Sequence, residues 1–172
     1  MREEKRVIKR SLSESENEGE RHYAGIGEMK VAHNPSVLII MGLGSCIGLT
    51  FHDRYAKVGG IAHIMLPDSR GFVEKSCKYA DTAVPLLLKE MMRSKAKKGQ
   101  IVAKIAGGAT MFSGMDTLQI GKRNTEVIKE ALKNEGIILV AEDTGGSSGR
   151  TITLDIQTGK LSVKNKKEIK TI

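Results

Sequence analysis

Cys46 and His63 are the residues of this sequence best suited to covalent chemistry. Cys46 directly follows the glycine-rich segment 42–45, and His63 lies in the second apolar segment after it. Because glycine adopts positive φ angles without strain, a sharp turn at Gly42 and Gly44 would expose the thiol that follows. A neighbouring imidazole lowers the pKa of a thiol and accepts its proton. Such a pair would perform nucleophilic acyl transfer.

The backbone around Cys46 offers a second element of that chemistry. In a turn formed by Gly44 and Ser45, the N–H groups around Ser45 and Cys46 would be free to stabilise an oxyanion. Antiparallel pairing of segments 46–53 and 57–66 would bring His63 beside Cys46. However, free cysteine is also among the most buried residue types and behaves as a small hydrophobe. The residues alone leave both interpretations open: a nucleophile with its base, or a buried thiol near an unrelated imidazole.

Two other parts of the chain carry side chains that bear on a site. Cys77 has no glycine turn beside it and precedes a predicted helix, so we interpret it as a structural or surface residue. The segment 142–153 is rich in glycine and hydroxyl side chains. It is either a flexible loop or a second wall of the site, to which Thr144, Ser147 or Arg150 would contribute.

Nucleotide and metal chemistry are not favoured. The glycines of segment 42–48 are spaced one residue wider than in a dinucleotide-binding fingerprint, and a strand rather than a helix is predicted after them. The sequence has no P-loop lysine motif. Its four histidines lack metal-ligand spacing, and no cysteine pair accompanies them. We therefore predict no metal and no cofactor.

Hydrophobic patterning predicts short strands interleaved with two helices. Apolar runs bounded by turn residues favour strands at 24–33, 36–42, 46–53, 57–66, 101–109, 137–143, 150–156 and 160–165. Apolar residues at helical spacing favour helices at 78–99 and 124–136, ended by Gly99 and Gly136. Pro85 would kink the first helix or lie in its first turn, and Asn124 would cap the second. The pattern predicts a single α/β domain with a mixed sheet or sandwich and helices packed outside it.

Composition sets the limits of that domain. The chain has 172 residues and two cysteines, and no apolar run is long enough for a membrane span, which predicts one cytoplasmic domain with reduced thiols. Residues 1–22 are charged and predicted not to fold, residues 23–164 form the domain, and residues 165–172 form a basic tail. The net charge of +8 favours acidic partners, either nucleic acid or an acidic protein helix. Aromatic residues are only 3% of the chain, which weakens the nucleic-acid interpretation.

Six motifs together resemble the CheD family of chemoreceptor glutamine deamidases. They are GLGSC, AHIMLPDS, KYADTA, KIAGGATMF, IGKRNTE and EDTGGSSGRT, and they run in order from about Ala24 to about Val163. The resemblance implies a single-domain α/β sandwich with a cysteine-hydrolase site. It implies that Cys46 is the nucleophile, that His63 is the base, and that the substrates are glutamines on the cytoplasmic helices of chemotaxis receptors.

One position departs from the family pattern. Family members usually carry a threonine six residues before the catalytic cysteine, as the third member of the triad, and this sequence has Ile40 there. Isoleucine makes no hydrogen bond through its side chain. Another group, such as a backbone carbonyl, would then have to orient His63, or catalysis would be weaker.

The resemblance also implies a role from another class. CheD proteins bind a CheC-type phosphatase, so this chain could be a regulatory binding module with weak or no deamidase activity. Nucleic-acid binding through the positive charge is a third and weaker hypothesis, which predicts salt-sensitive affinity and has no use for Cys46.

Overall fold

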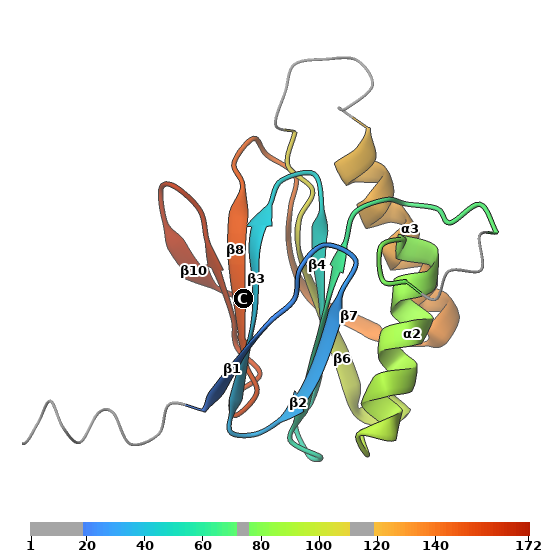
Figure 1. Cartoon of the computed structure of the whole chain (residues 1–172), viewed down its shortest axis with the longest axis vertical. Helices are drawn as coiled ribbons and strands as arrows, with labels where there is room; N and C mark the ends of the chain where they lie inside the picture. Colours follow the sequence, from blue (N-terminus) through green and yellow to red (C-terminus); the bar gives the residue numbers. More distant parts are fainter. Residues whose placement is uncertain (1–18, 72–75, 111–118) are drawn as a thin grey trace, which may run out of the picture.

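The computed structural model describes residues 19–71, 76–110 and 119–172, which form two five-stranded β-sheets packed face to face (Figure 1). Sheet A has the order β1-β3-β8-β9-β10 and sheet B the order β2-β5-β4-β6-β7. The strands of sheet A are Glu20–Tyr23, Ser36–Leu43, Arg150–Asp155, Leu161–Lys164 and Ile169–Thr171 in that order. The strands of sheet B are Met29–His33, Val58–Ile64, Ile47–Asp53, Ile101–Gly107 and Ile138–Thr144 in that order.

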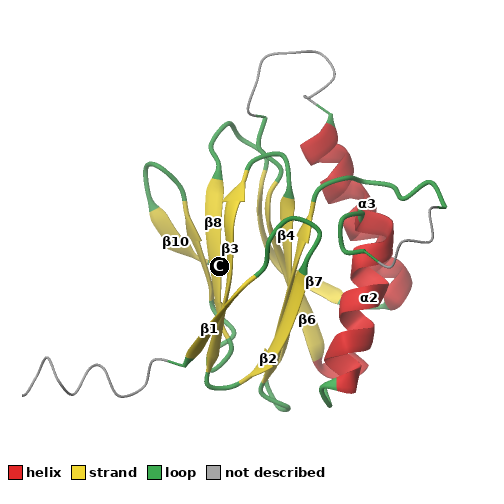
Figure 2. Cartoon of the chain, in the orientation of Figure 1, coloured by secondary structure: helices red, strands yellow, loops and turns green. Residues whose placement is uncertain are grey.

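Two α-helices cover the outer face of sheet B (Figure 2). They are α2 (Ala80–Arg93) and α3 (Ile120–Glu135), and the short 3-10 helix η1 (Lys98–Gln100) precedes β6. Pairing is parallel for β1–β3 and β6–β7 and antiparallel for the other neighbours in the sheets. The predicted mixed α/β sandwich with two main helices is therefore confirmed.

Alternation along the strands divides the apolar core into two layers. One face of β4 and β5 packs on the helices through residues such as Leu49, Phe51 and Ile64. The opposite face of sheet B meets sheet A through residues such as Ile61, Leu38 and Ile152. A strand that is buried on both faces reads as a nearly continuous apolar run, which explains why the sequence located β3, β4 and β5 within one residue or two.

The ends of both helices differ from the prediction. Helix α2 ends at Arg93, six residues before Gly99, with Ser94 as its C-cap. Pro85 lies inside that helix, neither at its start nor in its first turn. Helix α3 begins at Ile120, so Asn124 lies within it rather than capping it. Gly136 does end α3, in the left-handed conformation with φ 67°.

Both predicted tails are shorter than expected within the described residues. Strand β1 begins at Glu20, inside the segment predicted not to fold, and pairs in register with β3. Strand β10 lies inside the predicted basic tail and pairs with β9. Backbone hydrogen bonds hold both segments in the sheet. The prediction rested on charged side chains, which do not prevent backbone pairing. Residues 1–18 lie outside the described residues.

Among the described residues, neither helix is long and apolar enough to cross a membrane.

Candidate active site

Antiparallel pairing of β4 and β5 places Cys46 and His63 on the same face of sheet B. His63 lies opposite Gly48, which is two residues after Cys46. Side chains two positions apart on a strand share a face, so the side chains of Cys46 and His63 both project between the two sheets. Packing supports this direction, because Cys46 contacts the inter-sheet core and a side chain at Gly48 would meet Ile152. The predicted antiparallel pairing of segments 46–53 and 57–66 is confirmed.

Burial sets the electrostatics of His63. Its side chain is only 3% exposed, and neither ring nitrogen has a hydrogen-bond partner among the described residues. Burial lowers the pKa of His63 below its ordinary value, and the nearby Ala24 backbone offsets part of this by raising it. The Ala24 backbone thus lies near enough to raise the pKa of the ring but outside hydrogen-bond geometry. At neutral pH, His63 is an uncharged imidazole ready to accept a proton.

The Cys46 thiol has the matching property. Cys46 is half-buried, and burial raises the pKa of its thiol while its own backbone N–H lowers it. A raised thiol pKa and a lowered imidazole pKa both favour the neutral pair over a thiolate–imidazolium ion pair. The arrangement therefore suits a base that takes the thiol proton as the nucleophile attacks.

The turn that carries Cys46 is held through its carbonyl groups. Gly108 N donates to the Cys46 carbonyl and Ala109 N donates to the Gly44 carbonyl, both at 2.8 Å. The Ser45 carbonyl accepts a bond from the Asn124 side chain at 3.3 Å. The N–H groups of residues 44–46 donate no hydrogen bond to another group in the described parts of the chain. Free N–H groups beside a nucleophile are the donors that an oxyanion requires.

The loop after β7 contacts segment 107–110, which in turn contacts the Cys46 turn. Gly145 N donates to the Gly107 carbonyl and Thr110 N donates to the Gly146 carbonyl. Segment 107–110 therefore lies between this loop and the Cys46 turn. Ser147 is exposed and Thr144 is half-buried at the end of β7.

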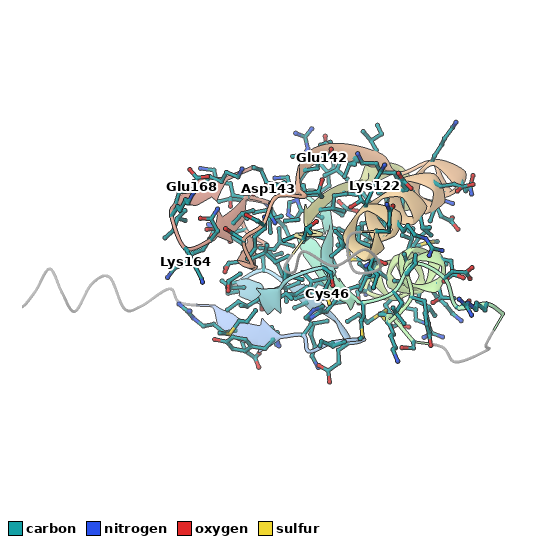
Figure 3. The ribbon with its side chains drawn as sticks, turned by 90° about the horizontal axis from the view of Figure 1, so that it is seen from above. Cys46, Lys122, Glu142, Asp143, Lys164 and Glu168 are labelled. Atoms are coloured by element: carbon teal, nitrogen blue, oxygen red, sulfur yellow. The ribbon has the colours of Figure 1, made fainter. Side chains whose placement is uncertain are left out.

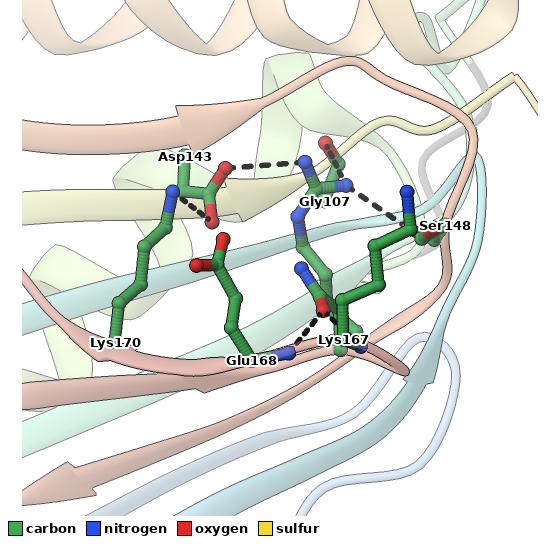
Figure 4. Close-up of polar contacts among 8 residues, drawn as sticks. Gly107, Asp143, Ser148, Lys167, Glu168 and Lys170 are labelled. Carbon is green, nitrogen blue, oxygen red and sulfur yellow. Dashed lines mark hydrogen bonds and ion pairs between the residues drawn. The ribbon is translucent and has the colours of Figure 1, made fainter.

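Arg150 is held by its own contacts. Its guanidinium donates to the carbonyls of Gly107 at 3.4 Å and Ser148 at 3.2 Å, and pairs with Asp143 at 3.1 Å. Lys170 of β10 pairs with the other oxygen of Asp143 at 3.0 Å (Figure 4). Burial raises the pKa of Asp143, but the two cations lower it and leave it below its ordinary value. These contacts hold the carbonyl group of Gly107, which packs against the Cys46 backbone.

Comparison with known proteins identifies the family. The model of the family described as CheD chemotactic sensory transduction matches residues 65–165. A chemoreceptor glutamine deamidase CheD of Thermotoga maritima is 51% identical over 140 residues, covering 81% of this chain and 88% of that protein. This chain belongs to the CheD family. Probable chemoreceptor glutamine deamidases CheD of Desulforamulus reducens and Thermococcus kodakarensis are 47% and 46% identical, covering 81% of this chain and 87% and 89% of theirs.

The likeness to solved structures is much lower. A crystal structure of a Bacillus licheniformis hypothetical protein, YfiH, has a TM-score of 0.46 and 16% identity, covering 74% of this chain and 60% of that one. A likeness of this size bears on neither mechanism nor substrate.

Ile40, which the resemblance assigned to the third position of the triad, is fully buried. It lies on β3 opposite Ile152 and belongs to the inter-sheet core, so it projects into the same layer as His63 but from the other sheet. Cys77 is also buried, against the helices, and burial raises the pKa of its thiol to about 11. A thiol with that pKa is inert at neutral pH.

Segment 107–109 and Asn124 hold the turn that carries Cys46, although no pattern in the sequence assigned them a role there. Gly107 has φ +120°, and a Cβ at this position would lie 2.3 Å from the Cys46 carbonyl oxygen. Both features lie within motifs that resemble the CheD family, KIAGGATMF and IGKRNTE. A glycine pair after a strand and a polar residue on the buried side of a helix were the available signals.

Proposed function

We propose that this protein deamidates glutamine side chains on the cytoplasmic helices of chemotaxis receptors, with Cys46 as nucleophile and His63 as base. The observation that carries the proposal is the placement of both side chains on one face of the β4–β5 pair, beside a turn whose N–H groups at residues 44–46 donate to no other group within residues 19–71, 76–110 and 119–172. Membership of the CheD family supplies the substrate class, because its relatives are named chemoreceptor glutamine deamidases.

The reaction proceeds in two acyl-transfer steps. As the Cys46 sulfur attacks the side-chain amide carbon, neutral His63 takes the thiol proton. The N–H groups near Ser45 and Cys46 hold the oxyanion while protonated His63 gives its proton to the departing nitrogen, which leaves as ammonia. His63 then takes a proton from water, whose oxygen attacks the thioester. The thiol is restored and the glutamine has become glutamate.

Mass spectrometry of a receptor cytoplasmic fragment tests this function. Incubation with the protein adds roughly one mass unit at each modified glutamine, since an amide NH2 becomes a hydroxyl through the acyl intermediate. Cys46→Ser abolishes the mass change and keeps the fold, because serine is a far poorer nucleophile with this base. Cys77→Ser is the matched control and retains the activity. Wild-type turnover in the Cys46→Ser protein contradicts the assignment of the nucleophile.

A CheC-type phosphatase belongs to the proposal as a further partner, and the site of action is cytoplasmic, where receptor signalling helices lie. A binding module without deamidase activity is not favoured, because relatives at 46–51% identity are named glutamine deamidases. Co-elution of the two purified proteins tests the partnership. Co-elution is compatible with the presence or absence of deamidase activity, so the mass measurement decides whether the protein is a deamidase.

A further inference from the structure

Asn124 connects the two chain segments that carry Cys46 and His63. Its side chain is fully buried on α3, and its Nδ2 donates to the Ser45 carbonyl at 3.3 Å and to the Met65 carbonyl at 3.0 Å. Ser45 directly precedes Cys46, and Met65 is the second residue after His63. Both hydrogens of one amide group therefore link the nucleophile turn to the end of β5.

The two acceptors fix the orientation of the Asn124 amide. Both are carbonyl oxygens, so only the NH2 group can face them. The opposite atom, Oδ1, is buried without a hydrogen-bond partner among the described residues. A buried acceptor left unpaired destabilises a fold relative to an apolar side chain of similar size. The Asn124 amide thus satisfies two carbonyl groups at the site while its own oxygen stays unpaired among the described residues.

The bond to the Ser45 carbonyl controls where the Cys46 N–H points. The peptide unit between these residues is planar, with its C=O and N–H directed to opposite sides. Fixing the Ser45 oxygen from the side of α3 therefore fixes the Cys46 N–H away from it. Gly108 and Ala109 hold the carbonyls on either side, so Asn124 holds the middle one of three consecutive carbonyl groups.

Close packing sets the depth of α3 at this point. A Cβ at Gly121 would lie 2.6 Å from the Gly108 carbonyl oxygen, so the first turn of the helix approaches the backbone of segment 107–108. Asn124 follows Gly121 by three residues and lies on the same side of the helix. Gly108 binds the Cys46 carbonyl and Asn124 binds the Ser45 carbonyl, so both bonds depend on where α3 packs.

We propose that Asn124 is a positioning residue, which orients the Cys46 peptide N–H toward the oxyanion and fixes the nucleophile turn relative to β5. The proposal rests on the proposed function for its catalytic meaning. Its effect on the Cys46 thiol is independent of that function, since the Cys46 N–H lowers the pKa of its own thiol and a peptide no longer held by Asn124 would stabilise the thiolate less.

The test compares Asn124→Leu with wild type in two independent assays. Turnover on a receptor fragment should fall by about 100-fold in kcat with KM changed less than about twofold, because a misplaced oxyanion donor acts on the transition state. The rate of iodoacetamide alkylation at Cys46, followed by peptide mapping, should need a higher pH to reach half its maximum. Ile128→Ala, on the same helix and equally buried, is the control. It should lower the melting temperature and change neither quantity.

The outcomes separate this proposal from the proposed function. If wild type modifies no glutamine, the function fails, and the alkylation midpoints of wild type and Asn124→Leu still decide the role of Asn124. A folded Asn124→Leu protein with wild-type kcat and an unshifted alkylation midpoint overturns the proposal. If that variant does not fold, Asn124→Ala is measured in the same assays. Failure of both to fold makes Asn124 a requirement of the fold and also overturns the proposal.

Discussion

Burial sets the protonation of the Cys46–His63 pair. It raises the pKa of the thiol and lowers that of the imidazole, so the resting pair is neutral. Because the resting pair is neutral, the thiolate arises by proton transfer from Cys46 to His63. In the view from above, Cys46 lies near the centre of the molecule, and Lys164 and Glu168 lie to one side (Figure 3).

The pH dependence of kcat/KM follows from these two shifts. The active free enzyme has a neutral His63, whose pKa lies below its ordinary value of 6.5, and a protonated Cys46, whose pKa lies above 9.0. Activity is therefore lost as pH falls through the lowered imidazole pKa and stays high until the raised thiol pKa is approached. Steady-state rates across this range measure it. Fast alkylation of Cys46 persisting down to about pH 4, as in papain-type ion pairs, would contradict a neutral pair.

Ile40→Thr tests whether His63 lacks an orienting partner. The new hydroxyl would project into the inter-sheet layer, where the ring nitrogens of His63 have no partner among the described residues. We expect higher deamidation turnover, since an oriented ring keeps the productive tautomer. The free energy of unfolding should fall by less than the roughly 1–3 kcal/mol that an unsatisfied buried hydroxyl costs.

Turnover on a receptor fragment and a denaturant melt of both proteins measure the two effects. The matched control is Leu38→Thr, since Leu38 lies on the same face of β3 two residues before Ile40, is equally buried, and pairs with Leu154. Unchanged or lower turnover with reduced stability would mean that another group already orients His63, and that Ile40 only fills the core.

The end of β6 directly contacts the turn that carries Cys46. Gly107 approaches the Cys46 carbonyl so closely that no Cβ fits, and the next two N–H groups hold the carbonyls of Cys46 and Gly44. Arg150 and Asp143 fix the same segment from the other side. The end of β6 therefore helps to determine the position of the thiol, together with Asn124.

Gly107→Ala should reduce turnover much more than it reduces folding. A Cβ at Gly107 must displace the Cys46 backbone, and its φ of +120° strains any residue with a side chain. A displacement of about 1 Å at the nucleophile costs on the order of 100-fold in rate. Gly99→Ala is the control, because a Cβ there meets nothing within 4 Å. Turnover and melting temperature of the two variants measure the effect, and equal turnover in both would show that the turn does not depend on Gly107.

Both ends of the described chain close sheet A. Strand β1 covers one edge by pairing with β3, and β10 covers the other by pairing with β9 and reaching Asp143 through Lys170. Ala24, directly after β1, donates to the Ile39 carbonyl and lies in the inter-sheet core beside His63. The N-terminal strand thus contributes to the surroundings of the site.

Deleting residues 1–23 should lower the melting temperature relative to deleting residues 1–18. The longer deletion removes β1 and exposes β3 as an edge strand. For a protein of this size, each kcal/mol lost lowers the melting temperature by about 2–4 °C. Calorimetry of the two truncated proteins isolates the contribution of β1. Identical melting curves would show that β1 adds nothing to the stability of sheet A.

The sequence by itself determined most of the strands and the pairing of β4 with β5, because a strand buried on both faces leaves a nearly continuous apolar run. From that pairing it placed His63 beside Cys46. Tertiary structure decided what composition does not encode. Strands β1 and β10 joined sheet A through backbone hydrogen bonds, which depend little on the side chains. Asn124 became a buried link rather than a helix cap because contacts far apart in sequence, at Ser45 and Met65, determine its partners.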